Sequence, residues 1–322
     1  MNNVVSLFCG CGGADIGIIG GFSYNKQNYE NLPFKINYAV DIDKKAIATY
    51  KENFSNCDVV CDDIKNINVE SIPQCDVLVG GFPCQSFSTV NPTKNPYDDR
   101  AQLYLEMVRI AKVKNPKIII AENVKGFKTL HKGKIFNTVI TAFENIGYNI
   151  TTSLLNASDF GIPQKRERVF IIAIRKDIYE KKGMFTFPDK TTENIKIPLS
   201  IAVSKLDIDE KKYYFSERAV LGLKKAKNNM KRGLAQNLDE PCLTITSHLA
   251  KTSLNSRDPV LLVNSKKELY RRFTPKEAAC IQSFPDSFKF IGTELDAYRQ
   301  IGNAIPPVMF WHIAKSISKY IE

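Results

Sequence analysis

Short apolar segments alternate with amphipathic segments over the first 175 residues of the chain. The apolar segments are rich in Val, Ile and Leu and have the length of strands; they lie at 4–8, 36–40, 75–80, 117–121, 149–155 and 169–174. Helical patterns lie between several of them, around 43–53, 102–114 and 133–146. This alternation predicts an α/β fold whose mostly parallel sheet is covered on both faces. The last two apolar segments have no helical pattern between them, which predicts an antiparallel pair at one edge.

The pattern changes after residue 175. Residues 176–270 are richer in Lys, Asn, Thr and Ser and contain only broken apolar runs, which predicts a smaller, irregular, β-rich unit. Near the end of the chain, Pro306 and Pro307 precede an apolar stripe with helical spacing, which predicts a terminal helix that packs back on the first unit. We therefore predict one domain from residues 1–188 and 282–322, with a second domain, 189–281, inserted into it.

A glycine-rich turn, Phe8-Cys-Gly-Cys-Gly-Gly13, follows the first predicted strand. Such a strand-to-helix turn lets a ligand approach the backbone closely. A dinucleotide fingerprint requires a third glycine at position 15, where this chain has Asp15, so a nucleoside cofactor without a pyrophosphate fits better. Asp41 ends the strand at 36–40, where a carboxylate accepts hydrogen bonds from ribose hydroxyls. Asp63, in the segment Cys61-Asp-Asp-Ile64, ends a further predicted strand and could accept a hydrogen bond from the adenine amino group. An ordinary tight turn with two solvated aspartates is the alternative interpretation.

Three further segments carry candidate chemistry at strand ends. Cys84 follows Gly-Gly-Phe-Pro83 after the strand at 75–80, so its thiol is presented where open α/β sheets bind ligands. Glu122 directly follows an apolar strand, where an unpaired carboxylate is costly to bury. Arg166 and Arg168 precede the strand at 169–174 and, two residues apart, are expected to share one face. Taken singly, each residue could also be structural or solvated.

The net charge of +11 is confined to one part of the chain. Residues 161–272 hold 24 basic and 13 acidic residues, whereas 1–160 and 273–322 are each balanced. A local excess indicates a polyanionic partner more strongly than a uniform excess does, and a solvated lysine-rich surface is the alternative interpretation. The eight cysteines and three histidines show no spacing typical of a zinc site, so no metal is expected. No segment is long and apolar enough to span a membrane, and no secretory signal is evident, so a cytoplasmic protein with reduced thiols is expected.

These segments, in this order, resemble the C5-cytosine-specific DNA methyltransferases of bacterial restriction–modification systems. The matching segments are FCGCGG, GGFPCQSFS, AENV, QKRER, RRFTPKEAACIQSFP and QIGNAIPP, which together extend from residue 4 to residue 307. The resemblance implies a Rossmann-like, S-adenosylmethionine-dependent methyltransferase fold with an inserted target-recognition domain. It also implies double-stranded DNA as the partner, with no membrane and no metal, and a chain that acts as a monomer.

The resemblance also implies roles for individual residues. Cys84 corresponds to the nucleophile that adds to C6 of cytosine, and Glu122 to the carboxyl group that contacts N3 and the exocyclic amine. Arg168 corresponds to a residue that holds the flipped base, and Arg166 to one that supports the site. The implied cofactor contacts are Phe8, Gly10, Cys11, Gly12, Gly13, Asp41, Ile42, Asp63, Ile64, Gly81, Pro83, Leu103, Asn303 and Ala304. The implied DNA-recognition residues are Thr244, Ile245, Arg271 and Arg272.

The implied chemistry is consistent with the residue types. Cytosine C5 is a weak nucleophile, and addition of a thiolate at C6 activates it. The base must leave the duplex first, because C5 and C6 are inaccessible within the stack. A tRNA cytosine methyltransferase of the same fold remains an alternative, although the insertion of about 90 residues favours DNA. A non-catalytic DNA-binding relative would be expected to lack Cys84, Glu122 or the glycines, and all of them are present.

Overall fold

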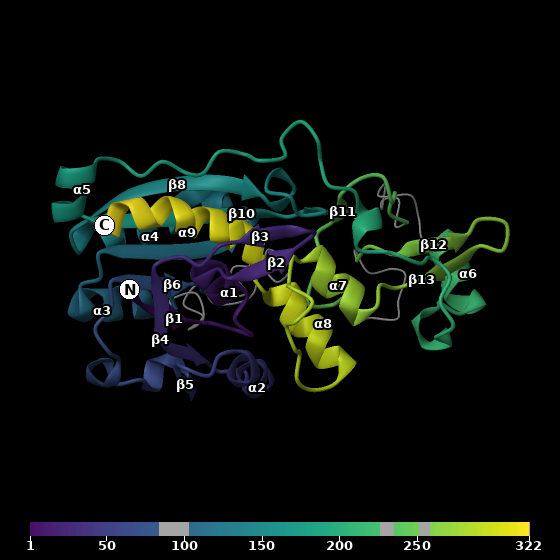
Figure 1. Ribbon diagram of the computed structural model, residues 1–322, viewed down its shortest axis with the longest axis horizontal. Coiled ribbons are helices and arrows are strands. Elements are labelled where there is room, and N and C mark those ends of the chain that lie inside the picture. The colour runs from purple at the N-terminus through teal and green to yellow at the C-terminus, as the bar shows by residue number, and fades with distance from the viewer. Residues whose placement is uncertain (84–102, 226–234, 251–257, 322) are drawn as a thin grey trace.

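A computed structural model describes residues 1–83, 103–225, 235–250 and 258–321 (Figure 1). Two lobes lie along the long axis of the molecule: a large lobe that contains both chain ends and a small lobe at the other end (Figure 1). The small lobe contains α6 (Glu217–Lys225), β12 (Leu261–Asn264) and β13 (Leu269–Arg271).

The large lobe is built on a seven-stranded sheet with the order β5-β4-β1-β6-β7-β10-β8. The first five strands pair in parallel, whereas β10 is antiparallel to both β7 and β8. The prediction of a mostly parallel sheet with an antiparallel pair at one edge is therefore confirmed. The strands are β1 (Asn2–Leu7), β4 (Phe34–Asp41), β5 (Asp58–Cys61), β6 (Val77–Gly80), β7 (Ile118–Val124), β8 (Tyr148–Asn156) and β10 (Glu167–Arg175).

Helices cover both faces of this sheet, as the alternating pattern predicts. Val4 packs in the same buried cluster as α1 (Gly13–Ile19) and α9 (Pro307–Ile321), whereas its neighbour Val5 packs with α3 (Tyr104–Lys114) and α4 (Lys134–Asn145). Successive strand residues thus serve opposite layers. The large lobe also contains α2 (Lys44–Asn53) and α5 (Lys176–Lys182), and a short hairpin joins β2 (Phe22–Tyr24) to β3 (Gln27–Tyr29).

The last helix packs back on the first unit, as predicted, and there it contacts α1. Pro307 occupies the first position of α9, where its missing N–H is not needed. Gly17 of α1 allows the close approach: a Cβ at this position would lie 2.6 Å from the carbonyl oxygen of Pro307 and 2.8 Å from the Cβ of Phe310. Phe310, Ile313 and Ile317 are fully buried in the interface.

The second half of the chain is irregular between α5 (Lys176–Lys182) and α7 (Pro275–Ile281). Besides α6, β12, β13 and two short 3₁₀ helices (Leu199–Ile201 and Lys211–Tyr213), its regular structure among the described residues is β11 (Cys242–Leu243), which pairs with β9 (Gln164–Lys165) of the large lobe. A separate core, which we refer to as the small-lobe core, joins residues of this region to α7 and α8 (Glu294–Asn303). It includes Ile245, Phe273 and Ile301. This core crosses the predicted domain boundary at residues 281 and 282, and that boundary stays a prediction.

Candidate active site

A cavity of about 1050 Å³ lies at the carboxyl ends of β1, β4, β6 and β7. The chain proceeds outward from β1 through β4 to β5 and then returns to β6 on the other side of β1. Ligands of open α/β sheets bind at such a switch point. One continuous cavity is lined both by the glycine-rich turn after β1 and by Glu122, Arg166 and Arg168.

The turn after β1 exposes backbone to the cavity. Phe8 lies at the end of the strand with a left-handed backbone (φ 54°), and Gly10 has a similar conformation (φ 55°). A Cβ at Gly10 would meet no atom within 4 Å, so this backbone borders open space. Gly13 is constrained differently, because a Cβ there would lie 2.5 Å from the carbonyl oxygen of Ile305. The turn is therefore held against the segment that follows α8.

The carboxylate of Asp41, at the end of β4, fixes the shape of the turn. Its Oδ2 accepts a hydrogen bond from the backbone N–H of Gly10 and its Oδ1 one from that of Asp43, both at 2.8 Å. Burial raises the pKa of Asp41 above its usual range, and the backbone N–H groups counteract this effect. Each oxygen retains a second lone pair, so the group can still accept from a ligand.

Two residues beside Asp41 border the same end of the cavity. Ile42 is 67% exposed although it is apolar, and it lines the cavity. Asp63 also lines the cavity, and its Oδ1 accepts a hydrogen bond from the backbone N–H of Lys65 at 3.0 Å. An exposed aliphatic surface beside hydrogen-bonding carboxylates suits a base and a ribose. The other predicted cofactor contacts on the cavity wall are Cys11, Ile64, Gly81, Pro83, Leu103, Asn303 and Ala304.

At the other end of the cavity, Glu122 and Arg168 form a buried ion pair. Arg168 Nε lies 2.9 Å from Glu122 Oε1, and each side chain is only 12% exposed. The pairing of β10 with β7 brings the two residues together, since Arg168 lies opposite Val124. Burial raises the pKa of Glu122 above its usual range, although Arg168 and Arg166 oppose this shift. The carboxyl group therefore keeps a proton more readily than a solvated glutamate does.

Arg166 lines the cavity too, but its guanidinium group joins segments of the protein. Its Nη1 donates to the carbonyl oxygen of Ile245 at 2.9 Å, and its Nη2 to those of Gly302 and Ala304 at 3.0 and 2.9 Å. The residue is 2% exposed and precedes β10 rather than lying in it. Arg166 thus ties the small-lobe core to the cavity wall, and its role in the reaction stays a prediction.

Comparison with known proteins identifies the family. The model of the C-5 cytosine-specific DNA methylase family matches residues 2–319. The chain belongs to this family. It is 33% identical to the type II methyltransferase M.NgoPII of Neisseria gonorrhoeae, over 99% of this chain and 96% of that protein. It is also 33% identical to the type II methyltransferase M.Bsp6I of Bacillus sp. (strain RFL6), over 99% of each.

Solved structures of the family share the fold. The methyltransferase EhMeth of Entamoeba histolytica superposes with a TM-score of 0.77 at 20% identity, and the alignment covers 100% of this chain and 99% of that one. The S. pombe Dnmt2 methyltransferase gives a TM-score of 0.75 at 21% identity, over 99% of each chain. The predicted Rossmann-like methyltransferase fold is therefore confirmed.

Two predicted site residues of this methyltransferase, Cys84 and Gly12, are not part of the described cavity wall. Cys84 lies outside the described residues, whereas Phe82 and Pro83, which precede it, lie at the cavity end of β6. Gly12 is not among the residues on the cavity wall, and a Cβ there would lie 2.3 Å from the Phe54 ring, so its left-handed backbone (φ 96°) allows close packing at the end of α2. Its contact with the cofactor stays a prediction.

The burial of Arg271 contradicts its predicted role in DNA recognition. Its side chain is fully buried, its Nη1 and Nη2 bind Glu277 at 2.8 and 2.7 Å, and its Nε donates to the carbonyl oxygen of Leu206. Arg272 donates to the carbonyl oxygens of Ala250 and Lys212. The resemblance implied contacts with DNA for both arginines, but burial assigns Arg271 to the fold.

The predicted pair Thr244 and Ile245 divides similarly. The Ile245 side chain is fully buried in the small-lobe core, so a direct contact of this side chain with a base is excluded in this conformation. Thr244 is partly exposed, and its Oγ1 donates to the carbonyl oxygen of Lys165 at 2.9 Å. Its role in recognition stays a prediction.

Sequence reasoning missed several residues of the cavity wall. Thr129, Leu130 and His131 line the cavity, as do Arg299 and Gln300. Gln300 is the first residue of the matching segment QIGNAIPP and Arg299 directly precedes it, so the sequence contained a signal for both. No recognised motif marked residues 129–131.

Most described cysteines are unsuited to nucleophilic chemistry. Burial raises the pKa of Cys9 and Cys242, and it raises that of Cys11, Cys57 and Cys75 to about 12. A thiol with such a pKa stays protonated near neutral pH. No cluster of three or more metal-binding side chains occurs among the described residues. A search of the same residues finds no helix with the length and apolar character of a membrane span.

Proposed function

We propose that this protein is an S-adenosylmethionine-dependent DNA (cytosine-5)-methyltransferase that flips a cytosine out of duplex DNA and methylates its C5 atom. The observation that carries the proposal is the buried Glu122–Arg168 pair in the same cavity as the glycine-rich turn. A base bound at the pair and a nucleoside bound at the turn would share one water-restricted space. Membership of the family supplies the class of reaction.

The residues present fit the proposed cofactor. The open backbone at Gly10, the exposed Ile42 side chain and the Asp41 carboxylate together offer room, an apolar surface and hydrogen-bond acceptors. Phe8 supplies an aromatic ring at the same wall. When bound, S-adenosylmethionine supplies an electrophilic methyl group on a sulfonium. The uncharged backbone of the turn, without a third glycine, favours this nucleoside over a dinucleotide.

Cys84 is proposed as the nucleophile. Its thiolate adds to C6 of the flipped cytosine, a C6–S bond forms, and the electron pair moves toward C5, which then accepts the methyl group. Loss of the C5 proton and elimination of the thiolate restore the aromatic ring and free the enzyme. The positions of Phe82 and Pro83 support this assignment, as does the neighbouring Gly81, at which a Cβ would lie 3.3 Å from Glu122 Oε2.

Glu122 is proposed to stabilise the charge that develops during the addition. With its pKa raised by burial, the carboxyl group can hold a proton at cytosine N3 while electron density moves into the ring. Arg168 holds Glu122 in place through the contact from Nε, and its Nη1 donates to the carbonyl oxygen of Glu167. This contact supports a role for Glu122 as a proton donor that is oriented before the base arrives.

A covalent trap tests the proposed reaction. Duplex DNA that carries 5-fluorocytosine at the target position lacks the C5 proton that must leave, so the adduct at Cys84 is expected to accumulate. Mass spectrometry of the digested complex should locate the added nucleotide on the peptide that contains Cys84. Cys84→Ala should abolish methyl transfer while binding of DNA and cofactor survives, and substantial turnover by this variant would contradict the covalent mechanism.

A second measurement addresses the substrate. The chain is expressed in a host without DNA methylation, and bisulfite sequencing of the host DNA should show 5-methylcytosine at one short recurring site. Methyl incorporation into duplex DNA is compared with incorporation into tRNA, and DNA is expected to be the substrate. We further propose that the protein acts in the cytoplasm as a monomer; incorporation confined to tRNA would overturn the assignment to DNA.

A further inference from the structure

A basic surface lies on the large lobe at the edge of the cavity, away from the segment that holds the excess charge. Residues 123–143 contain four lysines, one histidine and no acidic residue. They form the end of β7, two short 3₁₀ helices (Lys125–Lys128 and Leu130–Gly133) and most of α4. Lys128, Lys132 and Lys134 are exposed, and we refer to these three as the large-lobe lysines.

The large-lobe lysines differ from Lys125 and Lys165 in their partners. Lys125 pairs with Glu167 and Lys165 with Glu240, each at 2.8 Å. Within residues 1–83, 103–225, 235–250 and 258–321, by contrast, the three large-lobe lysines form no ion pair. Their charges are therefore available to an external anion.

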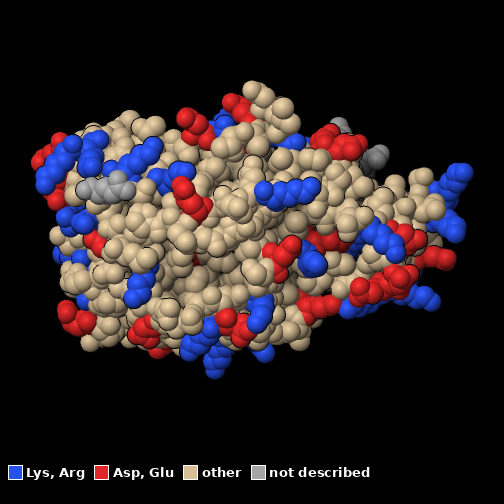
Figure 2. Space-filling view, in the orientation of Figure 1, with Lys and Arg blue, Asp and Glu red and all other residues tan. Residues whose placement is uncertain are grey.

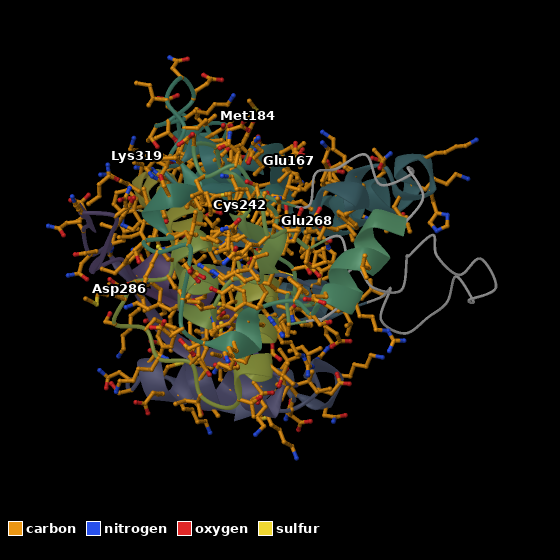
Figure 3. The ribbon with its side chains drawn as sticks, turned by 90° about the vertical axis from the view of Figure 1, so that its right-hand side faces the viewer. Glu167, Met184, Cys242, Glu268, Asp286 and Lys319 are labelled. Carbon is orange, nitrogen blue, oxygen red and sulfur yellow. The ribbon has the colours of Figure 1, made fainter. Side chains whose placement is uncertain are left out.

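The backbone that carries these lysines is fixed to the cavity. Phe127 is fully buried, and its ring contacts those of Phe82 and Phe136 edge-on, with centroid distances of 5.5 and 5.8 Å. Phe82 lies two residues after β6, and it lines the cavity, as do Thr129 and His131. Figure 3 labels Glu167, the ion-pair partner of Lys125.

Chain connectivity restricts where DNA can run when a base enters this cavity. A flipped base stays attached to its sugar, so the phosphates on both sides of the target nucleotide remain at the mouth of the cavity that holds Glu122. Unpaired lysines at such a position neutralise phosphates and release counterions whatever the base sequence.

We propose that the large-lobe lysines bind the phosphates that flank the flipped cytosine. This inference rests on the proposed function and deepens it, because it divides the DNA contacts between the two lobes. Contacts by the basic segment 161–272 would grip the surrounding duplex, whereas the large-lobe lysines hold the strand that carries the target base. Their effect should be independent of the sequence of the site.

The first test measures binding to a fluorescently labelled duplex that contains the site found by bisulfite sequencing. The triple variant Lys128→Gln/Lys132→Gln/Lys134→Gln should lower the slope of log K against log salt by about 0.9 for each phosphate contact that is lost. The matched control Lys181→Gln/Lys182→Gln/Lys319→Gln removes three exposed charges elsewhere on the large lobe. It should keep the wild-type slope, and the corresponding Lys→Arg triple variant of the large-lobe lysines should also keep it.

The second test locates the contact on the DNA. Uncharged methylphosphonate linkages on either side of the target cytosine should weaken binding by the wild type, but should cause no further loss in the Lys→Gln triple variant. Equal losses in both proteins, or an unchanged salt slope, would overturn the proposal. Methylation of the unmodified duplex by the wild type is measured in parallel, so failure of the proposed function itself is recognised by the absence of that activity.

Discussion

At the scale of single residues, burial determines the chemistry of two carboxyl groups. Glu122, at a strand end where an unpaired carboxylate is costly to bury, is paired with Arg168. Asp15 is fully buried beneath the glycine-rich turn. Its Oδ2 accepts a hydrogen bond from Ser6 at 3.0 Å, but its Oδ1 has no hydrogen-bond partner among the described residues. The sequence identified Asp15 only as a departure from a dinucleotide fingerprint.

The first prediction concerns Asp15 and the pH dependence of stability. Burial raises the pKa of Asp15 from 3.8 to about 7, against the opposing hydrogen bond from Ser6. The folded protein therefore holds this proton more tightly than the unfolded chain does. The contribution of Asp15 to stability is fully present below pH 3.8 and is lost as the pH rises through about 7. Since one pKa unit corresponds to about 1.4 kcal/mol, the loss is on the order of 1–4 kcal/mol.

Asp15→Asn should remove this loss, because an amide stays neutral at every pH in the range. Urea unfolding of the variant and the wild type at several values between pH 5 and pH 8 measures the difference. The free energy of unfolding of the variant minus that of the wild type should increase as the pH rises. Asp239→Asn, at an exposed position, is the control. Parallel curves for Asp15→Asn and the wild type would show that Asp15 is ionised in the folded protein.

At the scale of helices and strands, the hydrophobic pattern predicted most of the large lobe. Alternating burial along the strands and the spacing in α3, α4 and α9 are local properties of the sequence. The hairpin of β2 and β3 was missed because its strands have only three residues each. The turn before α4 was also missed. His131 and Lys132 have left-handed backbones (φ 47° and 58°) that side chains rarely adopt.

The second prediction concerns the contact between α1 and α9. Gly17→Ala introduces a methyl group 2.6 Å from the carbonyl oxygen of Pro307, so one helix must shift. We expect the free energy of unfolding to fall by about 1–3 kcal/mol, as in other overpacked interiors. Chemical denaturation measures the change. Gly126→Ala, where the new methyl group meets nothing within 4 Å, is the matched control and should leave stability nearly unchanged. Equal effects of the two substitutions would contradict the packing argument.

At the scale of the whole molecule, a buried polar network connects the lobes. Gln164 Nε2 donates to Gln282 Oε1 at 2.6 Å, and Gln164 Oε1 accepts from the backbone N–H of Ile245 at 2.9 Å. Arg166 adds its three bonds to carbonyl oxygens on both sides. Gly302 permits the approach, because a Cβ there would lie 2.2 Å from the backbone N of Ser247. The network thus holds the small-lobe core against the cavity wall.

The third prediction tests this connection. Arg166→Met keeps an apolar stem but leaves the carbonyl oxygens of Ile245, Gly302 and Ala304 without this donor. We expect the free energy of unfolding to fall by on the order of 2–5 kcal/mol. The KM values for cofactor and DNA should both rise, since Ala304 lines the cavity and Ile245 belongs to the small-lobe core.

The neighbouring substitution Lys165→Met serves as the control. It removes an exposed charge that pairs with Glu240 at the surface and should change stability by less than about 1 kcal/mol. Denaturation and steady-state kinetics compare the two variants. If Arg166→Met were as stable as the wild type, the network could not be the element that holds the lobes together.

Part of the excess positive charge of residues 161–272 is used within the protein. Several basic residues of 161–272 are already engaged within the protein, among them Arg166, Arg168 and Arg271. On the face drawn in Figure 2, acidic and basic side chains are interspersed over the small lobe. A count of charges along the chain therefore overstates the number of cations that segment can offer to DNA, and phosphate contacts outside it become important.

The sequence by itself determined the sheet, the helices around it and the positions of Glu122, Arg168 and the glycine-rich turn. These follow from local periodicity and from strand ends, which a parallel sheet necessarily places at one edge. Only the tertiary structure decided which arginines are buried. Arg166 and Arg271 look like surface residues in the sequence, because burial and hydrogen bonding depend on contacts between segments that are distant along the chain. Contacts between distant segments also place Lys128, Lys132 and Lys134 beside the cavity, and no motif in the sequence marked these three lysines.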